Sequence, residues 1–406
     1  MPLKQTVLVT DAEERAALAV VRSLGRAGYR VTVCSPRSRP LAAASRHCRR
    51  AARVPDPLRL SEIYADRVSR LVREWSVDVL LPITEASLLA LLPRRHLLDD
   101  AVLPFATADL FSSICDKQRV LSIAADLGMA VPSQLVQEAA ASDAAAFASL
   151  EYPVVVKPAR SVAELRGDRE KTTVSYAVDP DDLVDKLASL SPSAYPVLLQ
   201  RRVIGPGLGV FLLRWGGEVL ASFAHRRIRE KPPAGGVSVY RRSVPMDLDL
   251  YGQACRLLER FDWNGVAMVE FKRDASSGRD YLMEVNGRFW GSLQLAIDAG
   301  VDFPALLVAA ALGDEPPSVH RYRVGVASRW WWGDVDHLLA RIRFSDADLR
   351  LSSDSHAKAR ALLHFMTLWR PGDRYEVLRL SDLRPFWAES VDWVRNVRSS
   401  RKRKGR

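Results

Sequence analysis

The sequence is poor in several features that would place it in a special class of protein. Its 406 residues contain four cysteines without paired spacing, which predicts neither a disulfide framework nor a zinc site. It has no run of eighteen apolar residues, so we expect no membrane span. The N-terminus enters a strand-like segment without the apolar core of a signal peptide. These absences predict a cytoplasmic protein.

Acidic residues are missing from the last thirteen positions, VRNVRSSRKRKGR, which carry seven basic side chains. The formal net charge of the chain is +11, and it falls to +4 without these seven. A terminal basic run predicts a disordered, solvated tail, with peripheral contact to an anionic surface as the alternative. Aromatic residues do not alternate with the basic ones, so we expect no binding to nucleic acid.

Glycine is missing from the turn after the first expected strand. The chain opens with the strand TVLVT, helical spacing over residues 12–27 and the strand YRVTVCS. A helix near residues 61–74 and the strand VDVLLPIT follow, and this alternation predicts a doubly wound parallel sheet. A dinucleotide site would need G-x-G-x-x-G where TDAEERAALA stands. A nicotinamide or flavin dehydrogenase is therefore disfavoured.

The pattern in the middle of the chain predicts an α+β fold with mostly antiparallel strands. The stretch ICDKQRVLSIAADLGMAVPS predicts a helix ending at Gly128, and residues 161–172 predict a polar loop. GVFLLRWGGEVLASFAHRRI predicts a hairpin that turns at two adjacent glycines. Beyond residue 317, SRWWWGDVDHLLARI begins a helical C-terminal extension. We interpret its tryptophans as core or an interface anchor rather than a substrate platform.

Two glutamates are expected to face each other across a hairpin. VAMVEFKRDASSGRDYLMEVNGR has two strand-like arms around a turn at residues 275–278, and Glu270 and Glu284 are equally distant from Ser277. Like charges directly across a ladder are unfavourable, so such a pair shares a proton or holds a cation. Asn286 lies on the same face and adds a neutral oxygen. This all-oxygen set suits Mg²⁺.

The alternative for the same glutamates is a solvated strand face. In that case Glu270 and Glu284 would pair with Lys272 and Arg288, which stand close to them in the sequence. Lys157, at the end of the apolar run PVVVK, would then be an ordinary surface lysine.

Taken in order, five motifs resemble those of the ATP-grasp superfamily of ATP-dependent carboxylate ligases. They are DK at 116–117, VVVKP at 154–158, LQRRVIGPGLGV at 199–210, VEFKRD at 269–274 and MEVNGR at 283–288. The likeness covers about residues 5–315. It is nearest to the carboxylate–amine ligase branch, which is similar to carbamoyl-phosphate synthase and D-aspartate ligase domains.

The resemblance implies a fold that is α/β and α+β in class. A doubly wound parallel α/β domain over residues 1–110 would precede an ATP-grasp domain over 111–315. The latter would have an ATP-binding lobe at about 150–205 and a catalytic lobe at about 206–315, built mostly from antiparallel sheets. A helical extension over 316–394 and the disordered basic tail over 395–406 would follow.

The resemblance also implies roles at the matching positions. Lys157 and Arg288 would be catalytic, Arg288 by stabilising the transferring phosphoryl group. Two Mg²⁺ ions, or Mn²⁺ in their place, would be held by Glu270, Glu284 and Asn286. Gln200 would lie beside the adenine amino group. The residues that would contact ATP are Lys117, Lys157, Gln200, Arg201, Val203 and Lys171.

The sequence departs from the family pattern at three places. The loop that covers the phosphates, residues 159–171, has the single glycine Gly167 instead of a glycine- and serine-rich sequence. Basic side chains of that loop, Lys171 among them, would then take over from backbone amides. Arg201 and Arg202 stand where an acidic and an aromatic residue are common, and Gly287 stands where proline is common.

Substrate contacts are expected around FAHRRIREKPPAGGVSVYRRSV, which resembles the loop that relatives place beside the acceptor substrates. Its basic residues suit an anionic substrate, and its glycines would let the backbone approach it. Glu85 follows the strand VDVLLPIT at the end where α/β sheets bind ligands, and is a candidate contact for the amine. The other candidates are His225, Arg226, Arg227, Arg229, Gly235, Gly236 and Ser238.

The predicted function is an ATP-dependent ligase that activates a small carboxylate as an acyl phosphate and couples it to an amine, releasing ADP and phosphate. One alternative on the same fold is carboxylation or carbamoylation through carboxyphosphate, although the chain lacks the biotin-attachment tripeptide Met-Lys-Met. Another is a non-catalytic nucleotide-binding scaffold that uses the basic tail and the tryptophan-rich extension. Besides its small-molecule substrates, a homodimer partner is expected.

Overall fold

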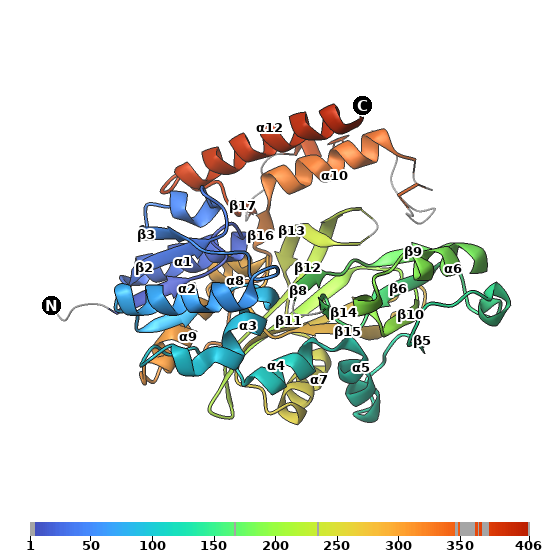
Figure 1. Ribbon diagram of the computed structural model, residues 1–406, viewed down its shortest axis with the longest axis horizontal. Helices are drawn as coiled ribbons and strands as arrows, with labels where there is room; N and C mark the ends of the chain where they lie inside the picture. The colour runs from blue at the N-terminus through green and yellow to red at the C-terminus, as the bar shows by residue number, and fades with distance from the viewer. Residues whose placement is uncertain are drawn as a thin grey trace.

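The computed structural model describes residues 5–165, 168–233, 235–345, 348–349, 362–363, 365–367 and 373–404. Figure 1 shows an N-terminal α/β unit and a small sheet on either side of a large antiparallel sheet, with two C-terminal helices across the top. Gly167, the single glycine of the expected phosphate loop, lies outside the described residues.

The N-terminal unit is a parallel sheet in the order β3-β2-β1-β4. All residues of β1 and β4 are buried, as expected for apolar strands covered on both faces. The predicted parallel α/β unit is therefore confirmed. Its strands are β1 Thr6–Val9, β2 Arg30–Ser35, β3 Cys48–Arg53 and β4 Val79–Leu81, and its helices are α1 Arg15–Ala27, α2 Ser61–Glu74 and α3 Glu85–Leu91.

A helical connection leads to the small sheet. It holds α4 Ala108–Cys115 and α5 Lys117–Asp126 where one helix was predicted. The break falls at Asp116, whose carboxylate accepts the backbone N–H of Arg119 and so caps α5. Short 3₁₀ segments lie at η1 Leu41–Ala44, η2 Leu92–Leu97, η3 Ala144–Phe147 and η4 Pro192–Ala194.

The small sheet has the order β5-β10-β6-β9 and its own apolar core with helix α6. A two-stranded hairpin, β7–β8, follows β6, so the prediction of a polar loop over residues 161–172 was wrong. The hairpin has too few apolar residues to show a strand pattern in the sequence. The elements are β5 Gln134–Gln137, β6 Val154–Pro158, β7 Val162–Leu165, β8 Asp168–Lys171, β9 Ser175–Ala177, α6 Pro180–Ala188 and β10 Val197–Arg201.

The large sheet has the order β15-β14-β11-β12-β13-β16-β17 and is antiparallel except for its last pair. Its β11–β12 hairpin turns at Gly216 and Gly217, as predicted. Its strands are β11 Gly207–Trp215, β12 Glu218–Lys231, β13 Val237–Ser243, β14 Gly265–Arg273, β15 Asp280–Asn286, β16 Ala327–Arg329 and β17 Asp373–Tyr375. The helices of this part are α7 Leu248–Arg260, α8 Leu293–Ala299 and α9 Phe303–Ala311.

The C-terminal part contributes α10 Trp331–Arg343 and α12 Arg384–Lys404. These helices lie side by side across the molecule, and α12 reaches the N-terminal unit at η1 (Figure 1). Residues 395–404 continue α12, so this stretch is helical where we predicted a disordered tail.

No single helix among the described residues is long and apolar enough to cross a membrane. Helices α8 and α9 reach that length and composition only as a pair, and they meet at a bend of 92°.

Candidate active site

Glu270 and Glu284 face each other directly across the β14–β15 ladder. The register pairs these two residues and also Met268 with Asn286. A β-bulge follows Glu270, so the symmetry of the hairpin holds at the glutamates and is broken beyond them. The predicted opposition of the two carboxylates is therefore present in the structure.

Each of these carboxylates has a cation that comes from another strand. Lys157 Nζ on β6 lies 3.0 Å from Glu284 Oε2, and Arg227 Nη2 on β12 lies 2.6 Å from Glu270 Oε2. The alternative, in which the two glutamates pair with Lys272 and Arg288, is not what the structure shows. The solvated-face interpretation is thus replaced by a compact cluster of alternating charges.

The two glutamates differ in their electrostatic environment. Burial raises the pKa of Glu284, but the ammonium groups of Lys157 and Lys117 outweigh it, so the net pKa is lowered well below the usual range. Burial also raises the pKa of Glu270, and there the Arg227 guanidinium does not reverse it, partly because the Glu284 carboxylate is close. Two opposed acids with pKa values driven apart are typical of a site that binds cations.

Asn286 and Arg288 extend the row of polar groups along β15. Asn286 Nδ2 donates to Glu284 Oε1 at 3.2 Å, and Arg288 Nη2 donates to Asn286 Oδ1 at 3.1 Å. Between them, Gly287 packs so tightly that a Cβ there would lie 2.4 Å from the ring of Trp263. The row is therefore continuous, and a glycine is needed within it.

The N-terminal unit and the helical connection each supply one further charge. Lys117 at the start of α5 is buried and donates from Nζ to Ser161 Oγ at 2.8 Å. Glu85 at the start of α3 is buried, and its Oε1 has no hydrogen-bond partner among the described residues. Burial raises the pKa of Glu85, while Arg288 and Lys117 oppose the rise. Both residues therefore act electrostatically on the same cluster.

A cavity of about 680 Å³ lies in front of this cluster, between the small and the large sheet. One side of it, which we call the hinge, is formed by Gln200, Arg201 and Val203, three of the residues predicted to contact ATP. Gln200 Nε2 donates to Gln134 Oε1 at 2.6 Å, whereas Gln200 Oε1 is buried and unpartnered within the described chain. The site residues that line the cavity are Lys157, Gln200, Arg201, Val203, His225, Arg227, Gly235, Gly236, Ser238, Glu270, Glu284, Asn286 and Arg288.

Five predicted residues do not line this cavity: Glu85 and Lys117, described above, and also Arg226, Arg229 and Lys171. Arg226 is exposed because it alternates with His225 and Arg227 on β12 and so points to the other face. Arg229 forms two 2.6 Å contacts with Asp334 on α10. Lys171 is exposed on β8.

Several unpartnered polar atoms gather at the inner end of the cavity. Both ring nitrogens of His225, Ser238 Oγ and Trp290 Nε1 are buried without a partner among the described residues. Burial lowers the pKa of His225 well below its usual value, and the Arg227 charge adds to this, so the ring is neutral. These atoms leave hydrogen-bonding capacity that a bound ligand could use.

Sequence reasoning missed two residues of the cavity. Trp290 was not singled out in the sequence, although it lines the cavity and packs against Phe211, with ring centroids 4.4 Å apart. Lys272 donates from Nζ to the carbonyl oxygen of Val203 at 3.0 Å and so fixes the hinge. Its spacing of two from Glu270 was the available signal, because it places both side chains on one face.

The donor set around the glutamates fits Mg²⁺. It consists of two carboxylates and one carboxamide, with side chains of Glu270 and Glu284 that are 15% and 24% exposed at the cavity. Within the described residues, no group of three or more His, Cys, Asp or Glu side chains could hold a metal alone. Mg²⁺ bound by few carboxylates usually completes its ligand shell with water and substrate phosphates. The set therefore suits a metal that arrives with a nucleotide.

Comparisons with known proteins give a family match over part of the chain and a shared fold. Residues 194–331 match a family described as ATP-grasp in the biosynthetic pathway with Ter operon. No curated protein is similar enough in sequence to match.

Solved structures resemble the chain over most of its length. An L-amino acid ligase from Bacillus licheniformis has 17% identity and a TM-score of 0.58, over 77% of this chain and 75% of that one. An N5-carboxyaminoimidazole synthetase from Staphylococcus aureus complexed with ADP has 15% identity and a TM-score of 0.60, over 80% and 82%. A biotin carboxylase from Campylobacter jejuni has 15% identity and a TM-score of 0.60, over 80% and 74%. The resemblance seen in the five motifs agrees with the family match over residues 194–331, and the chain shares the fold of these solved structures.

Proposed function

We propose that the protein is an ATP-dependent ligase that activates a carboxylate as an acyl phosphate and couples it to an amine. The observation that carries this proposal is the direct opposition of Glu270 and Glu284 across one ladder, at a cavity where Lys157 and Arg288 also converge. On a solvated strand face, like charges opposite each other only destabilise the sheet. At a phosphoryl-transfer site the same two carboxylates can bind a metal, which neutralises phosphate charge.

The nucleotide base would lie at the hinge. The unpartnered Gln200 Oε1 suits the amino group of adenine, and the backbones of Arg201 and Val203 suit the edge of the purine. Lys272 supports this assignment because its hydrogen bond to the Val203 carbonyl holds the hinge in place. The triphosphate would then extend toward Lys157 and the two glutamates.

The phosphate end would be held by charges that the structure has already gathered. Lys117 and Lys157 would contact phosphate oxygens, and Arg288 would stabilise the transferring phosphoryl group. Glu270, Glu284 and Asn286 would hold Mg²⁺, which neutralises phosphate charge when bound. Lys157 now neutralises Glu284 at 3.0 Å, and with the metal bound it would turn to the phosphates.

The two chemical steps balance without a redox partner. In the first, an oxygen of the substrate carboxylate bonds to the γ-phosphorus, the bond to the β–γ bridging oxygen breaks, and ADP leaves. In the second, the amine nitrogen bonds to the acyl carbon, phosphate leaves, and the nitrogen loses a proton. Neutral His225 and buried Glu85 lie at or near the site and are candidates to position the co-substrates.

The test is release of ADP and phosphate from Mg·ATP with pooled amino acids, small carboxylates and bicarbonate. Glu284→Gln should lower turnover by at least ~100-fold, because a metal ligand is lost. The matched control is Glu218→Gln, an exposed glutamate on β12 of the same sheet, which should keep wild-type turnover.

Each outcome has a clear meaning. ADP release that needs both a carboxylate and an amine, and that disappears in Glu284→Gln, supports the ligase. Release that needs bicarbonate instead identifies the carboxyphosphate alternative. Nucleotide binding without turnover in any pool would favour the non-catalytic scaffold, and a chain that binds no ATP would refute the proposal.

A further inference from the structure

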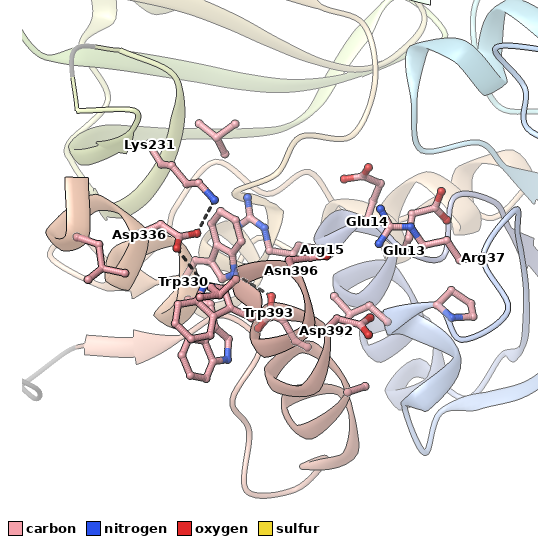
Figure 2. Close-up of a pocket in the computed structure, with 18 of the residues that line it drawn as sticks. Glu13, Glu14, Arg15, Arg37, Lys231, Trp330, Asp336, Asp392, Trp393 and Asn396 are labelled. Atoms are coloured by element: carbon pink, nitrogen blue, oxygen red, sulfur yellow. Dashed lines mark hydrogen bonds and ion pairs between the residues drawn. The ribbon is translucent and has the colours of Figure 1, made fainter. Parts of the chain in front are cut away.

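A second cavity, larger than the first, lies between the N-terminal unit and the two C-terminal helices. Its volume is about 1210 Å³. Figure 2 shows it between Glu13, Glu14 and Arg37 of the N-terminal unit and the side chains of α10 and α12. We call it the tryptophan pocket, after Trp330, Trp332 and Trp393, which line it.

The three indole rings are held in fixed positions. Trp330 Nε1 donates to Glu389 Oε1 at 2.8 Å, Trp332 Nε1 to Ser390 Oγ at 2.9 Å, and Trp393 Nε1 to Asp336 Oδ1 at 2.9 Å. The rings of Trp332 and Trp393 stack with centroids 4.2 Å apart. A rigid aromatic wall of this kind is already ordered, so a ligand that binds it pays little ordering entropy.

The inner cations of the pocket are already neutralised. Lys231 Nζ lies 2.5 Å from Asp336 Oδ2. Arg15 lies 3.9 Å above the ring of Trp330, and its Nη1 is 2.5 Å from Glu376 Oε2. The other arginines of the lining, Arg37, Arg39 and Arg343, are exposed and therefore solvated.

The inner acids, in contrast, have no salt bridge among the described residues. Glu389 Oε2 is buried without a hydrogen-bond partner among the described residues. Glu13 is partly buried and accepts a hydrogen bond from Ser35 Oγ at 2.6 Å, with no Lys, Arg or His in salt-bridge contact among the described residues. Burial raises the pKa of Glu13 and raises that of Glu389 to about 7. A bound cation would reverse both shifts, and indole faces also attract cations.

The tryptophan pocket adjoins the nucleotide cavity. Lys231 and Val237, at the ends of β12 and β13, line both cavities. On the other side of the boundary, Arg15 Nη2 lies 3.3 Å from the Cβ position of Gly291, which lines the nucleotide cavity. A ligand in the tryptophan pocket could thus extend past Arg15 and Lys231 toward Arg288.

We propose that the tryptophan pocket binds one end of a co-substrate, a primary ammonium group on an apolar, ring-bearing body, while the reacting group of that co-substrate extends toward Arg288. Its ammonium group would contact Glu389, and its apolar body would lie against the indole rings. This inference rests on the proposed ligase function, and it replaces our interpretation of the tryptophans as only core or anchor. The large volume favours a molecule bulkier than a small free amino acid.

The test compares three probes of the same shape and different charge by calorimetric titration of the full chain at pH 8. The probes are 2-phenylethylamine, 2-phenylethanol and 3-phenylpropionate. The amine should bind at least ~10-fold more tightly than the alcohol or the acid, as a charge-assisted contact provides. Glu389→Gln keeps an acceptor for Trp330 Nε1 and should remove that preference. Glu14→Gln, at an exposed glutamate of the rim, should keep it.

The outcomes separate this inference from the function on which it rests. A preference for the amine that Glu389→Gln abolishes supports the pocket assignment, and it should persist in Glu284→Gln. Equal binding of the three probes, tighter binding of the acid, no binding at all, or an unchanged preference in Glu389→Gln would overturn it. ATP turnover in the pooled assay tests the ligase independently, so either can fail alone.

Discussion

At the scale of single residues, the site depends on how one lysine acts on one carboxylate. Lys157 and Lys117 keep Glu284 ionised although it is buried beside a second acid. The folded pKa of Glu284 is lowered, so its ionised form stabilises the protein above the unfolded value of ~4.3, and this contribution is lost as the pH falls. Lys157 therefore has a structural effect as well as the proposed role at the phosphates.

Lys157→Met tests both roles. Turnover in the ADP-release assay should fall by at least ~100-fold, because a positioned charge is lost from the phosphoryl-transfer site. The acid midpoint of unfolding should move to higher pH, because the pKa of Glu284 rises when the ammonium is removed. Lys186→Met, which removes a partly exposed lysine from α6 in the same lobe, is the control and should change neither. An unaltered acid midpoint in Lys157→Met would contradict the electrostatic account.

The contribution of Glu389 to stability depends on pH in the opposite direction to that of Glu284. Its pKa is raised to about 7 by burial, against the hydrogen bond from Trp330 and the charge of Arg15, which lower it. A raised pKa means that this group's contribution to stability is complete below ~4.5 and is lost as the pH rises through about 7. Glu389→Gln should thus be more stable than wild type at pH 8, by on the order of 1 kcal/mol, and equal to it near pH 4. Thermal melts of both proteins across this range measure the difference, and a gain that is the same at every pH would rule out titration of Glu389 as its cause.

At the scale of elements, sequence reasoning worked where the signal is local. The opposition of Glu270 and Glu284 could be read from their equal distance to the turn, because a hairpin pairs residues by simple counting. The cations that pair with these glutamates could not be predicted in this way, because Lys157 and Arg227 come from strands distant in sequence. Arg226 illustrates a related limit, since alternation along β12 shows which residues share a face but not which face meets the cavity.

The end of β15 depends on one glycine. A Cβ on Gly287 would lie 2.4 Å from Trp263 and 3.1 Å from Ile114, so Gly287→Ala must displace the strand end or the indole. We expect a loss of ~1–3 kcal/mol in stability, which is typical of overpacking, and lower turnover because Arg288 follows directly. Gly252→Ala, in α7 where a Cβ meets nothing closer than 3.8 Å, should instead be neutral or slightly stabilising. Denaturant unfolding and the ADP-release assay on both variants decide the matter: a stable, fully active Gly287→Ala would refute this packing argument.

At the scale of the whole molecule, the C-terminal part closes the fold by returning to the N-terminal unit. Arg22 of α1 is fully buried, contacts Asp382 Oδ2 at 2.8 Å and donates to three backbone carbonyls between residues 376 and 382. Ser45 Oγ also donates to Asp382 Oδ2, at 2.7 Å. No sequence pattern could have predicted these contacts, because they join residues more than 330 positions apart and Arg22 lies within an apolar helix.

This closure also builds the tryptophan pocket, because α12 carries Trp393 and Glu389 to the N-terminal unit. Arg22→Met should therefore separate the two parts, since it leaves the Asp382 carboxylate buried without its cation. Removing one partner of a buried ion pair costs ~3–5 kcal/mol. The expected result is a lower melting temperature and faster proteolysis between β17 and α12, together with a weakened amine preference in the probe titration. Arg26→Met, at an exposed position of the same helix, should match wild type in all three measurements. If Arg22→Met lost stability but kept the amine preference, docking of α12 through Arg22 would not be needed to form the pocket.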